Sequence, residues 1–436
     1  MRKTIFISTG EVSGDLHGAM LIDALKRQAS VMGLELDIVA LGGEKMAQAG
    51  AKLLGNTTSI GSVGLLESLP FVLPTLQMQR RAKDYLKKHP PDLVVLIDYM
   101  GPNLGIGRFV RNQMPQIPII YYIAPQDWVW SARSIVPRDT MRIVEMTDKL
   151  LAIFPGEADY FEKKGATVTW VGHPLVDRME SSPKREEARA ALGIPPGQLA
   201  IAIVPASRRQ ELKYMMPIAF EAARELQSLL LGNGEWGMGN GEWGDKGEWE
   251  DKGEWEDKED KEDKEAILPP LPPLLTPHSP LFWIPLSLET YRGAIEKGIE
   301  DYGLNATIVA GKTNEVLAAA DLAIAKSGTV NLELALLNVP QVVFYRVSPF
   351  TYSIGELLKF SIPFMSPPNL VVMRPIVPEL LQEQATSENI VKESLELLFN
   401  QNRRKALMAD YQEMRELLGD VGVCNRAARE ITALFR

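Results

Sequence analysis

Short apolar runs recur along the chain, and longer stretches with the mixed polar and apolar spacing of surface helices separate them. Continuous apolar runs are typical of strands buried on both faces of a parallel sheet, and the intervening stretches suit crossover helices. The pattern therefore predicts an α/β fold. The predicted strands are 4–8, 36–41, 93–97, 119–123, 150–154 and 168–171, followed by 200–204, 281–285, 307–310, 322–324 and 342–345.

The strand pattern restarts after about residue 195, and 436 residues are too many for one ordinary core. We therefore predict two Rossmann-like domains, 1–180 and 196–415, with parallel sheets facing across a cleft. A helix at 416–436 follows the second domain. Ligands of such sheets bind at the carboxyl ends of the strands, so a cleft between the domains is the expected site.

One segment interrupts the second domain. Residues 233–265 repeat Gly-Glu-Trp with Asp and Lys padding, and a proline-rich stretch continues to residue 280. Low complexity and like charges predict a disordered or solvated excursion, with a docking role for the tryptophans as the alternative. The segment holds 14 acidic residues and 5 lysines, which accounts for the whole net charge of −9. The remainder is formally neutral, so charge gives no case for nucleic-acid binding.

Composition places the chain among globular proteins of a reducing cytoplasm. Hydrophobic residues make up 45% and charged residues 24%, and no apolar run is long enough to span a bilayer. The N-terminus enters a strand directly and lacks a signal-peptide pattern. Cys424 is the only cysteine, so we expect neither a disulfide framework nor a cysteine-based metal site.

A Ser-Gly-Thr turn is the most informative motif. Ser327, Gly328 and Thr329 lie between a predicted strand and a run of helix-forming residues. Such a turn can bind a phosphate through backbone N–H groups at the start of a helix. Glu333 follows about one helical turn later, within reach of a sugar hydroxyl. An ordinary N-cap is the alternative.

The first predicted strand runs into a second polar turn that contains Glu11, Ser13 and Asp15. The turn matches neither a Walker A loop nor a Gly-x-Gly-x-x-Gly fingerprint, and no acidic residue ends the second strand to hold an NAD ribose. A nicotinamide enzyme is therefore disfavoured. The two acids and the serine suit binding of sugar hydroxyls, and helix capping by Ser13 or Asp15 is the alternative.

Three further groups stand at strand ends. Asp98 follows the strand 93–97 and is a candidate general base, with an Asx-turn cap as the alternative. Ser207 and Arg208 follow the strand 200–204, where an arginine fork suits a diphosphate; a surface arginine is the alternative. No other histidine has ligand spacing to His173, so we expect no metal there and interpret His173 as a hinge or cleft residue.

An unusual apolar stretch occupies residues 63–76 and is followed by Arg and Lys residues. An interfacial membrane contact or an acyl-chain groove fits this pattern, and a core-facing helix is the alternative. Pro70 and Pro74 favour an irregular, partly exposed segment over regular helix. The candidate contact residues are Leu66, Leu69, Phe71, Val72 and Leu73.

Taken in order, these motifs resemble the lipid-A-disaccharide synthases, glycosyltransferases of the GT-B fold. The resemblance covers nearly the whole chain except about residues 230–280. It includes the Trp-x-Trp of 128–130, Gly-His-Pro-Leu at 172–175, Tyr-Arg at 345–346, and Pro-Pro-Asn-Leu at 367–370 with Pro-Glu-Leu-Leu-Gln at 378–382. Each motif is modest alone, but their order and spacing are specific.

The resemblance implies a reaction. 2,3-Diacylglucosamine would pass from UDP to the 6-hydroxyl of 2,3-diacylglucosamine 1-phosphate, with inversion at the anomeric centre and without a metal or cofactor. Asp98 would be the base. Ser207, Arg208, Ser327, Gly328 and Thr329 would hold the diphosphate, Glu333 the ribose and Asn369 the nucleotide side of the cleft. Glu11, Ser13, Asp15 and Asn103 would face the acceptor.

The resemblance also implies peripheral association with the cytoplasmic face of the inner membrane. The helix 416–436 would pack back on the first domain or exchange with a second subunit of a homodimer. Met100, Gly101, Lys326 and Ala206 depart from the family pattern. A related glycosyltransferase with another lipid acceptor, a UDP-sugar 2-epimerase and a catalytically silent UDP-sugar-binding protein are therefore the alternatives.

Overall fold

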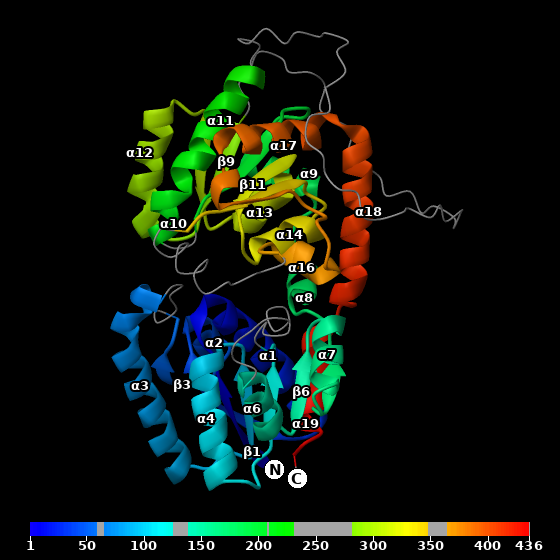
Figure 1. The fold of residues 1–436 in the computed structure, drawn as a ribbon. Coiled ribbons are helices and arrows are strands. Elements are labelled where there is room, and N and C mark those ends of the chain that lie inside the picture. The colour runs from blue at the N-terminus through cyan, green and yellow to red at the C-terminus, as the bar shows by residue number, and fades with distance from the viewer. Residues whose placement is uncertain (59–64, 125–137, 207–208, 231–280, 348–363, 436) are drawn as a thin grey trace, which may run out of the picture.

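The computed structural model describes residues 1–58, 65–124, 138–206, 209–230, 281–347 and 364–435 (Figure 1). The repeat segment 233–280, the Trp-x-Trp of 128–130, Ser207 and Arg208 lie outside these ranges. The side chains of Leu66, Leu69 and Phe71 lie outside the description as well. The predictions made for all of these residues therefore remain predictions.

The N-terminal half forms a seven-stranded sheet in which the pairings are parallel and the order is β3-β2-β1-β4-β5-β6-β7. The chain adds strands in one direction from β1 to β3 and in the other from β4 to β7, so the order reverses between β1 and β4. Its strands are β1 (Arg2–Ser8), β2 (Glu35–Gly42), β3 (Lys52–Asn56), β4 (Leu93–Ile97), β5 (Ile119–Tyr122), β6 (Lys149–Ala152) and β7 (Val168–Trp170).

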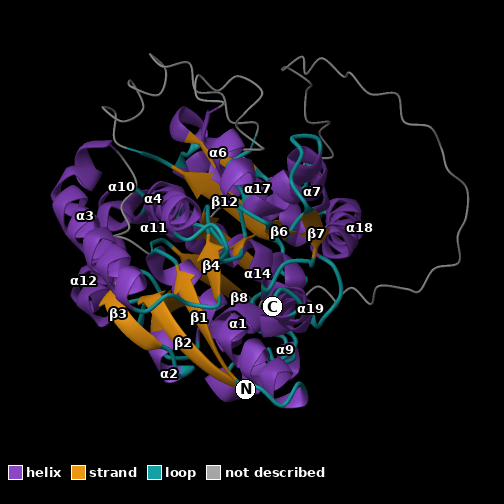
Figure 2. Cartoon of the chain, turned by 90° about the horizontal axis from the view of Figure 1, so that it is seen from below, coloured by secondary structure: helices purple, strands orange, loops and turns teal. Residues whose placement is uncertain are grey.

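Helices cover both faces of this sheet, as Figure 2 shows from below. Buried side chains lie on both sides of it in two separate clusters. This burial explains why the strands appear in the sequence as continuous apolar runs. The helices are α1 (Glu11–Val31), α2 (Glu44–Gln48), α3 (Leu65–Lys88), α4 (Met100–Gln113), α6 (Arg138–Met146) and α7 (Pro155–Glu162).

The C-terminal half forms a six-stranded parallel sheet in the order β10-β9-β8-β11-β12-β13, which reverses between β8 and β11. The fold-class prediction of two parallel-sheet, Rossmann-like domains is therefore confirmed. Its strands are β8 (Ala200–Val204), β9 (Leu281–Leu286), β10 (Ala306–Ala310), β11 (Leu322–Lys326), β12 (Gln341–Tyr345) and β13 (Glu379–Leu381).

The helices of the C-terminal half complete the second domain, and α8 (Leu175–Met179) precedes them where the two halves meet (Figure 1). They are α9 (Arg185–Leu192), α10 (Arg209–Tyr214), α11 (Met216–Leu230), α12 (Arg292–Tyr302), α13 (Thr313–Ala319), α14 (Val330–Leu336), α16 (Pro367–Val372) and α17 (Ser387–Phe399). The short 3-10 helices η1 (Glu289–Tyr291) and η2 (Gln382–Gln384) complete the set.

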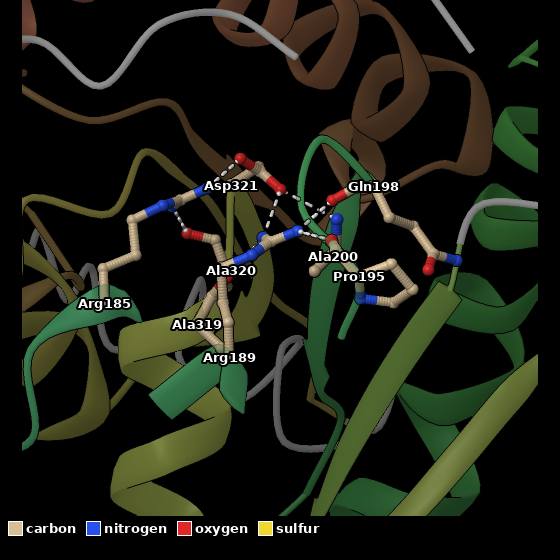
Figure 3. Close-up of polar contacts among 8 residues, drawn as sticks. All are labelled: Arg185, Arg189, Pro195, Gln198, Ala200, Ala319, Ala320 and Asp321. Atoms are coloured by element: carbon tan, nitrogen blue, oxygen red, sulfur yellow. Dashed lines mark hydrogen bonds and ion pairs between the residues drawn. The ribbon is translucent and has the colours of Figure 1, made fainter. Parts of the chain in front are cut away.

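A buried ionic cluster attaches α9 to the second sheet (Figure 3). Asp321, at the start of β11, forms ion pairs with Arg185 and Arg189 from α9, and its side chain is 4% exposed. Its Oδ2 also accepts a hydrogen bond of 2.8 Å from the Ala200 N–H. Arg189 additionally donates to the carbonyl of Gln198. One carboxylate thus joins the chain entering the second domain to its two central strands.

The end of the chain returns to the first domain. After α18 (Gln401–Leu418), which runs down the side of the second domain, α19 (Val423–Thr432) packs against α1 (Figure 1). The Asp177 carboxylate of α8 accepts hydrogen bonds from the backbone N–H groups of Gly422, Val423 and Cys424. Both termini lie together at one end of the molecule, with the Lys3 ammonium over the Phe435 ring.

Helix α3 differs from the sequence-based expectation. Pro70 and Pro74 were expected to impose irregular structure, but the helix runs through both of them from Leu65 to Lys88. Pro74 is exposed, so solvent can hydrate the carbonyl that loses its helical partner. The expectation of partial exposure holds for Val72, Leu73 and Leu76, which are 45%, 69% and 55% exposed. No helix in the described part of the chain is both long and apolar enough to cross a bilayer.

Candidate active site

Both sheets place candidate residues at their topological switch points, where the strand order reverses. Asp98 follows β4, and the Gly10–Asp15 segment, which begins α1, follows β1, its neighbour in the first sheet. Ser327 follows β11, whose neighbour β8 leads toward α10 in the second sheet. In open α/β sheets, ligands bind in the crevice that forms at this point. Helices α8, α14 and α16 lie where the two domains meet (Figure 1).

Asp98 occupies a strained backbone position. It has a φ of 47°, and Tyr99 beside it has a φ of 48°, a region that non-glycine residues seldom adopt. Two side chains hold the Asp98 carbonyl: the Tyr121 hydroxyl and the Asn103 amide each donate to it at 2.7 Å. The side chain of Asp98 is only partly buried. Strain of this kind persists where the surroundings over-determine it and is common at functional sites.

Asn103 connects the two strands of the first switch point. Its side chain is fully buried, its Oδ1 accepts a 2.7 Å hydrogen bond from the Ser8 hydroxyl, and its Nδ2 also donates to the carbonyl of Ile97. These bonds, with the one to Asp98, engage the amide within the protein. The structure therefore gives Asn103 a positioning role toward Asp98, while a contact with an acceptor stays a prediction.

The segment after β1 was expected to be a polar turn, but helix α1 begins there at Glu11 and its packing shapes the segment. Asp15 is buried and accepts hydrogen bonds from the N–H groups of Gly43, Lys45 and Met46, so that it caps α2 through both of its oxygens. A Cβ at Gly10 would lie 2.3 Å from the Tyr99 ring, which requires glycine there. Ser13 is half-buried, and the Glu11 side chain is not described. Contacts of Glu11, Ser13 and Asp15 with an acceptor stay predictions.

A small cavity lies beside this turn. Its volume of about 10 Å³ is enough for a single water molecule. It is lined by Ser8, Thr9, Leu41, Thr57, Thr75, Met78, Gln79, Tyr99 and Pro102.

Glu157 is a buried acid that the sequence analysis missed. It is 0% exposed in α7, and its carboxylate accepts hydrogen bonds from the N–H groups of Ala124, Ile153 and Phe154. Burial raises its pKa to about 7, these hydrogen bonds oppose the rise, and the charge of Asp98 adds to it. Glu157 thus joins the carboxyl ends of β5 and β6 next to the candidate base.

The pKa of Glu157 predicts a pH dependence of stability. Its ordinary value is 4.5, so between about pH 4.5 and about pH 7 the folded state binds more protons than the unfolded state. The contribution of Glu157 to stability is present below that window and is lost as pH rises through it. We expect the stability advantage of the wild type over Glu157→Gln to fall by roughly 2–3 kcal/mol between pH 5 and pH 8. Urea denaturation of both proteins across this range measures it, and a constant difference would contradict it.

Two buried histidines lie near the junction of the domains. Burial lowers the pKa of His17 to about 4 and that of His173 to about 3. Both rings are therefore neutral at pH 7. The two rings lie edge to face with their centroids 5.9 Å apart. The Leu175 N–H donates to His173 Nδ1, and the backbone N–H of His173 donates to the Leu418 carbonyl. Its role as a hinge or cleft residue stays a prediction. Within the described ranges, no three His, Cys, Asp or Glu side chains form a metal-binding group.

The Ser-Gly-Thr turn is closed by internal hydrogen bonds. The Ser327 N–H donates to the Phe344 carbonyl, and the Ser327 hydroxyl donates to the Met365 carbonyl at 2.6 Å. The Gly328 N–H donates to the Asn331 side chain at 2.7 Å. The N–H groups of Ser327 and Gly328, which were expected to bind phosphate, are thus already hydrogen-bonded within the protein. Thr329 is exposed. Phosphate binding by the turn stays a prediction.

Glu333 reaches across the domain junction. Its Oε1 accepts a 2.6 Å hydrogen bond from Arg178 of α8, and its side chain is 8% exposed. Arg178 also contacts the Asn314 side chain at 3.4 Å. The ion pair fixes the orientation of the carboxylate and joins α14 to the segment between the domains. Motif spacing does not reveal this partner, because Arg178 and Glu333 are 155 residues apart in the chain.

Asn369 is fully buried in α16 and organises the segment leading to β13. Its Oδ1 accepts from the N–H groups of Ile376 and Val377, and its Nδ2 donates to the Val377 carbonyl and to Glu379. Glu379 in turn accepts from the N–H groups of Met365 and Ser366. This network shapes the loop beside Ser327, while a contact of Asn369 with a nucleotide stays a prediction.

The chain matches a family model described as "Lipid-A-disaccharide synthetase" over residues 5–232 and 278–433. A relative named lipid-A-disaccharide synthase, from Gloeothece citriformis (strain PCC 7424), is 54% identical over 98% of each chain. Another of the same name, from Synechocystis sp. (strain ATCC 27184 / PCC 6803 / Kazusa), is 50% identical over 98% of this chain and 96% of its own length.

Among solved structures, the fold is similar to that of a UDP-GlcNAc 2-epimerase from Neisseria meningitidis bound to UDP-GlcNAc. The TM-score is 0.56, and the match covers 99% of this chain and 100% of that one. The sequence identity is 11%, so the likeness concerns the fold alone.

Proposed function

The chain belongs to the lipid-A-disaccharide synthase family, and from that premise we propose that it forms the lipid A disaccharide from two acylated glucosamines. The donor is UDP-2,3-diacylglucosamine and the acceptor is 2,3-diacylglucosamine 1-phosphate. The products are a β-1,6-linked disaccharide 1-phosphate and UDP. The observation that supports this proposal most strongly is Asp98, held in a strained conformation at the switch point of the first sheet.

The proposed step is one direct displacement. The acceptor 6-hydroxyl oxygen forms a bond to the anomeric carbon of the donor, and its proton passes to the Asp98 carboxylate. The bond from the anomeric carbon to the β-phosphate oxygen breaks, and UDP leaves with the electron pair. Attack opposite the leaving group inverts the anomeric centre. Groups that stabilise negative charge on departing UDP lower the barrier.

The nucleotide side of the proposed site lies in the second domain. Ser207, Arg208, Ser327, Gly328 and Thr329 hold the diphosphate. Arg178 fixes one oxygen of Glu333. The other Glu333 oxygen accepts a hydrogen bond from a ribose hydroxyl. Asn369 shapes the loop beside Ser327.

UDP release with and without the acceptor tests this proposal, with EDTA present in both reactions. A glycosyltransferase releases UDP at a rate that depends on 2,3-diacylglucosamine 1-phosphate, and a metal-independent one does so in EDTA. Inversion at the second carbon of UDP-GlcNAc without any acceptor would instead identify an epimerase. Binding of UDP without turnover would identify a catalytically silent protein.

The exposed apolar face of α3 supports peripheral binding to the inner membrane. Val72, Leu73 and Leu76 lie on the solvent-exposed part of the helix, and exposed bases follow at Arg80, Arg81, Lys87 and Lys88. Apolar side chains that enter the lipid interface next to bases that meet anionic headgroups would hold the enzyme where its acylated substrates reside.

Changing Leu73 and Leu76 to serine is expected to reduce binding to vesicles containing anionic phospholipid by about tenfold or more, because two exposed leucines no longer enter the lipid. Co-sedimentation with phosphatidylglycerol vesicles measures it. Leu288→Ser, at a leucine 51% exposed in the second domain, is the matched control. Equal binding by the α3 variant and this control would remove the membrane role from α3.

A homodimer that exchanges residues 416–436 is a further part of the proposal. In this structure α19 packs on α1 of its own chain, so exchange would reproduce the same contact between two copies. Light scattering of the purified protein distinguishes a dimer from a monomer.

A further inference from the structure

Lys326 places a nearly buried positive charge at the second switch point. It ends β11, next to β8, and its side chain is 12% exposed. Its ammonium lies 3.4 Å from the Glu211 carboxylate, which is 6% exposed at the start of α10. A Cβ built on Gly328 would lie 3.0 Å from Lys326 Nζ, so the ammonium stands directly over the Ser-Gly-Thr turn.

We propose that Lys326 is a diphosphate-binding residue that stabilises negative charge on UDP, both when it binds and when it leaves. The inference rests on the proposed function and adds a residue to its site. Its basis is the position of the ammonium, at the carboxyl end of a central strand and over the turn that follows.

The hydrogen bonds within the Ser-Gly-Thr turn explain why the charge of Lys326 matters for binding a diphosphate. The N–H groups of Ser327 and Gly328 already donate to the Phe344 carbonyl and the Asn331 side chain. A diphosphate arriving at this conformation meets fewer backbone donors than the motif implies. A side-chain ammonium then supplies the compensating charge, and hydrogen bonds from a charged donor to phosphate oxygens are stronger than those from neutral ones.

Glu211 fixes the position of the Lys326 ammonium at the carboxyl end of β11 through their ion pair. An ammonium has three N–H donors, so an ion pair with one carboxylate does not by itself use all of them. The pair orients the ammonium over the Ser-Gly-Thr turn.

Comparison of UDP with uridine isolates this role, because uridine carries the same base and ribose but no phosphate. We expect Lys326→Met to weaken UDP binding by about tenfold to a hundredfold and to leave uridine binding unchanged. Lys326→Arg, which keeps the charge, should retain most of the affinity for UDP. Titration calorimetry of the full-length protein with each ligand measures both affinities. Lys213→Met, at an exposed lysine of α10, is the matched control.

Removing Lys326 leaves Glu211 buried without this partner, which could unfold the site. The double variant Lys326→Met/Glu211→Gln removes both charges and provides the second test. We expect it to lose affinity for UDP but not for uridine. Wild type that binds UDP no better than uridine would contradict the proposed diphosphate site itself. Wild type that prefers UDP, with the same preference kept in both the single and double variants, would overturn the role of Lys326 alone.

Discussion

Asp98→Ala is expected to reduce sugar transfer by about a thousandfold or more while UDP binding stays unchanged. A positioned general base contributes roughly 10²- to 10⁴-fold to a rate. The acceptor hydroxyl is a weak nucleophile until its proton is removed, and Asp98 stands at the end of a central strand of the first domain. Asp98→Asn keeps the shape of the side chain but removes the base, so it should lose activity to a similar extent.

The ratio of turnover between wild type and these variants measures the effect, with calorimetric UDP affinity as the check on folding. Asp159→Asn, at an exposed acid of α7 in the same domain, is the matched control and should turn over normally. Loss of the Asp98 charge should also lower the pKa of Glu157, because that charge contributes to its elevation. Turnover within a few-fold of wild type in Asp98→Asn would exclude Asp98 as the base.

Asp321→Asn is expected to destabilise the second domain by about 3–5 kcal/mol. Removing one partner of a buried ion pair leaves uncompensated charge behind. Here one carboxylate faces the guanidinium groups of Arg185 and Arg189 and receives the Ala200 N–H (Figure 3). Arg404 is also buried close by, and its Nη1 has no hydrogen-bond partner in the described part of the chain. Loss of Asp321 would leave three guanidinium groups without their common counter-charge.

Urea denaturation measures this loss of stability when unfolding is monitored through a spectroscopic signal from the second domain. The control is Asp301→Asn, which removes an exposed pair with Lys297 and should change stability by less than about 1 kcal/mol. If both variants shift the midpoint equally little, the cluster is not a major attachment of α9 to the sheet.

The alternation of apolar runs predicted most of the parallel strands, because strands buried on both faces leave a continuous apolar signal. Strands β3 and β13 were missed. Each lies at an edge of its sheet and is only partly buried, so neither has such a run. The interpretation of Pro70 and Pro74 as helix breakers was wrong, because α3 runs through both of them. Pro74 is exposed, where a helix tolerates proline at lower cost.

For the candidate site, the order of motifs along the sequence predicted where polar residues follow strands, but not which side chains they contact. The position of Asp98 follows from its place after β4. Arg178 and the Lys326–Glu211 pair make contacts between segments far apart in the chain, which spacing alone does not specify. Glu157 differs, because two of its partners, Ile153 and Phe154, lie four and three residues before it at the start of α7. Asp15 was open to sugar binding or helix capping from its motif, and the structure shows its carboxylate capping α2, a helix that the motif did not indicate.

Mass spectrometry of the reaction product tests the central claim most directly. Purified protein is incubated with UDP-2,3-diacylglucosamine, 2,3-diacylglucosamine 1-phosphate and EDTA. The account predicts a tetra-acylated disaccharide monophosphate together with an equal amount of UDP. Absence of the disaccharide from protein that binds UDP would contradict it, because the nucleotide site would then serve another acceptor or no transfer at all.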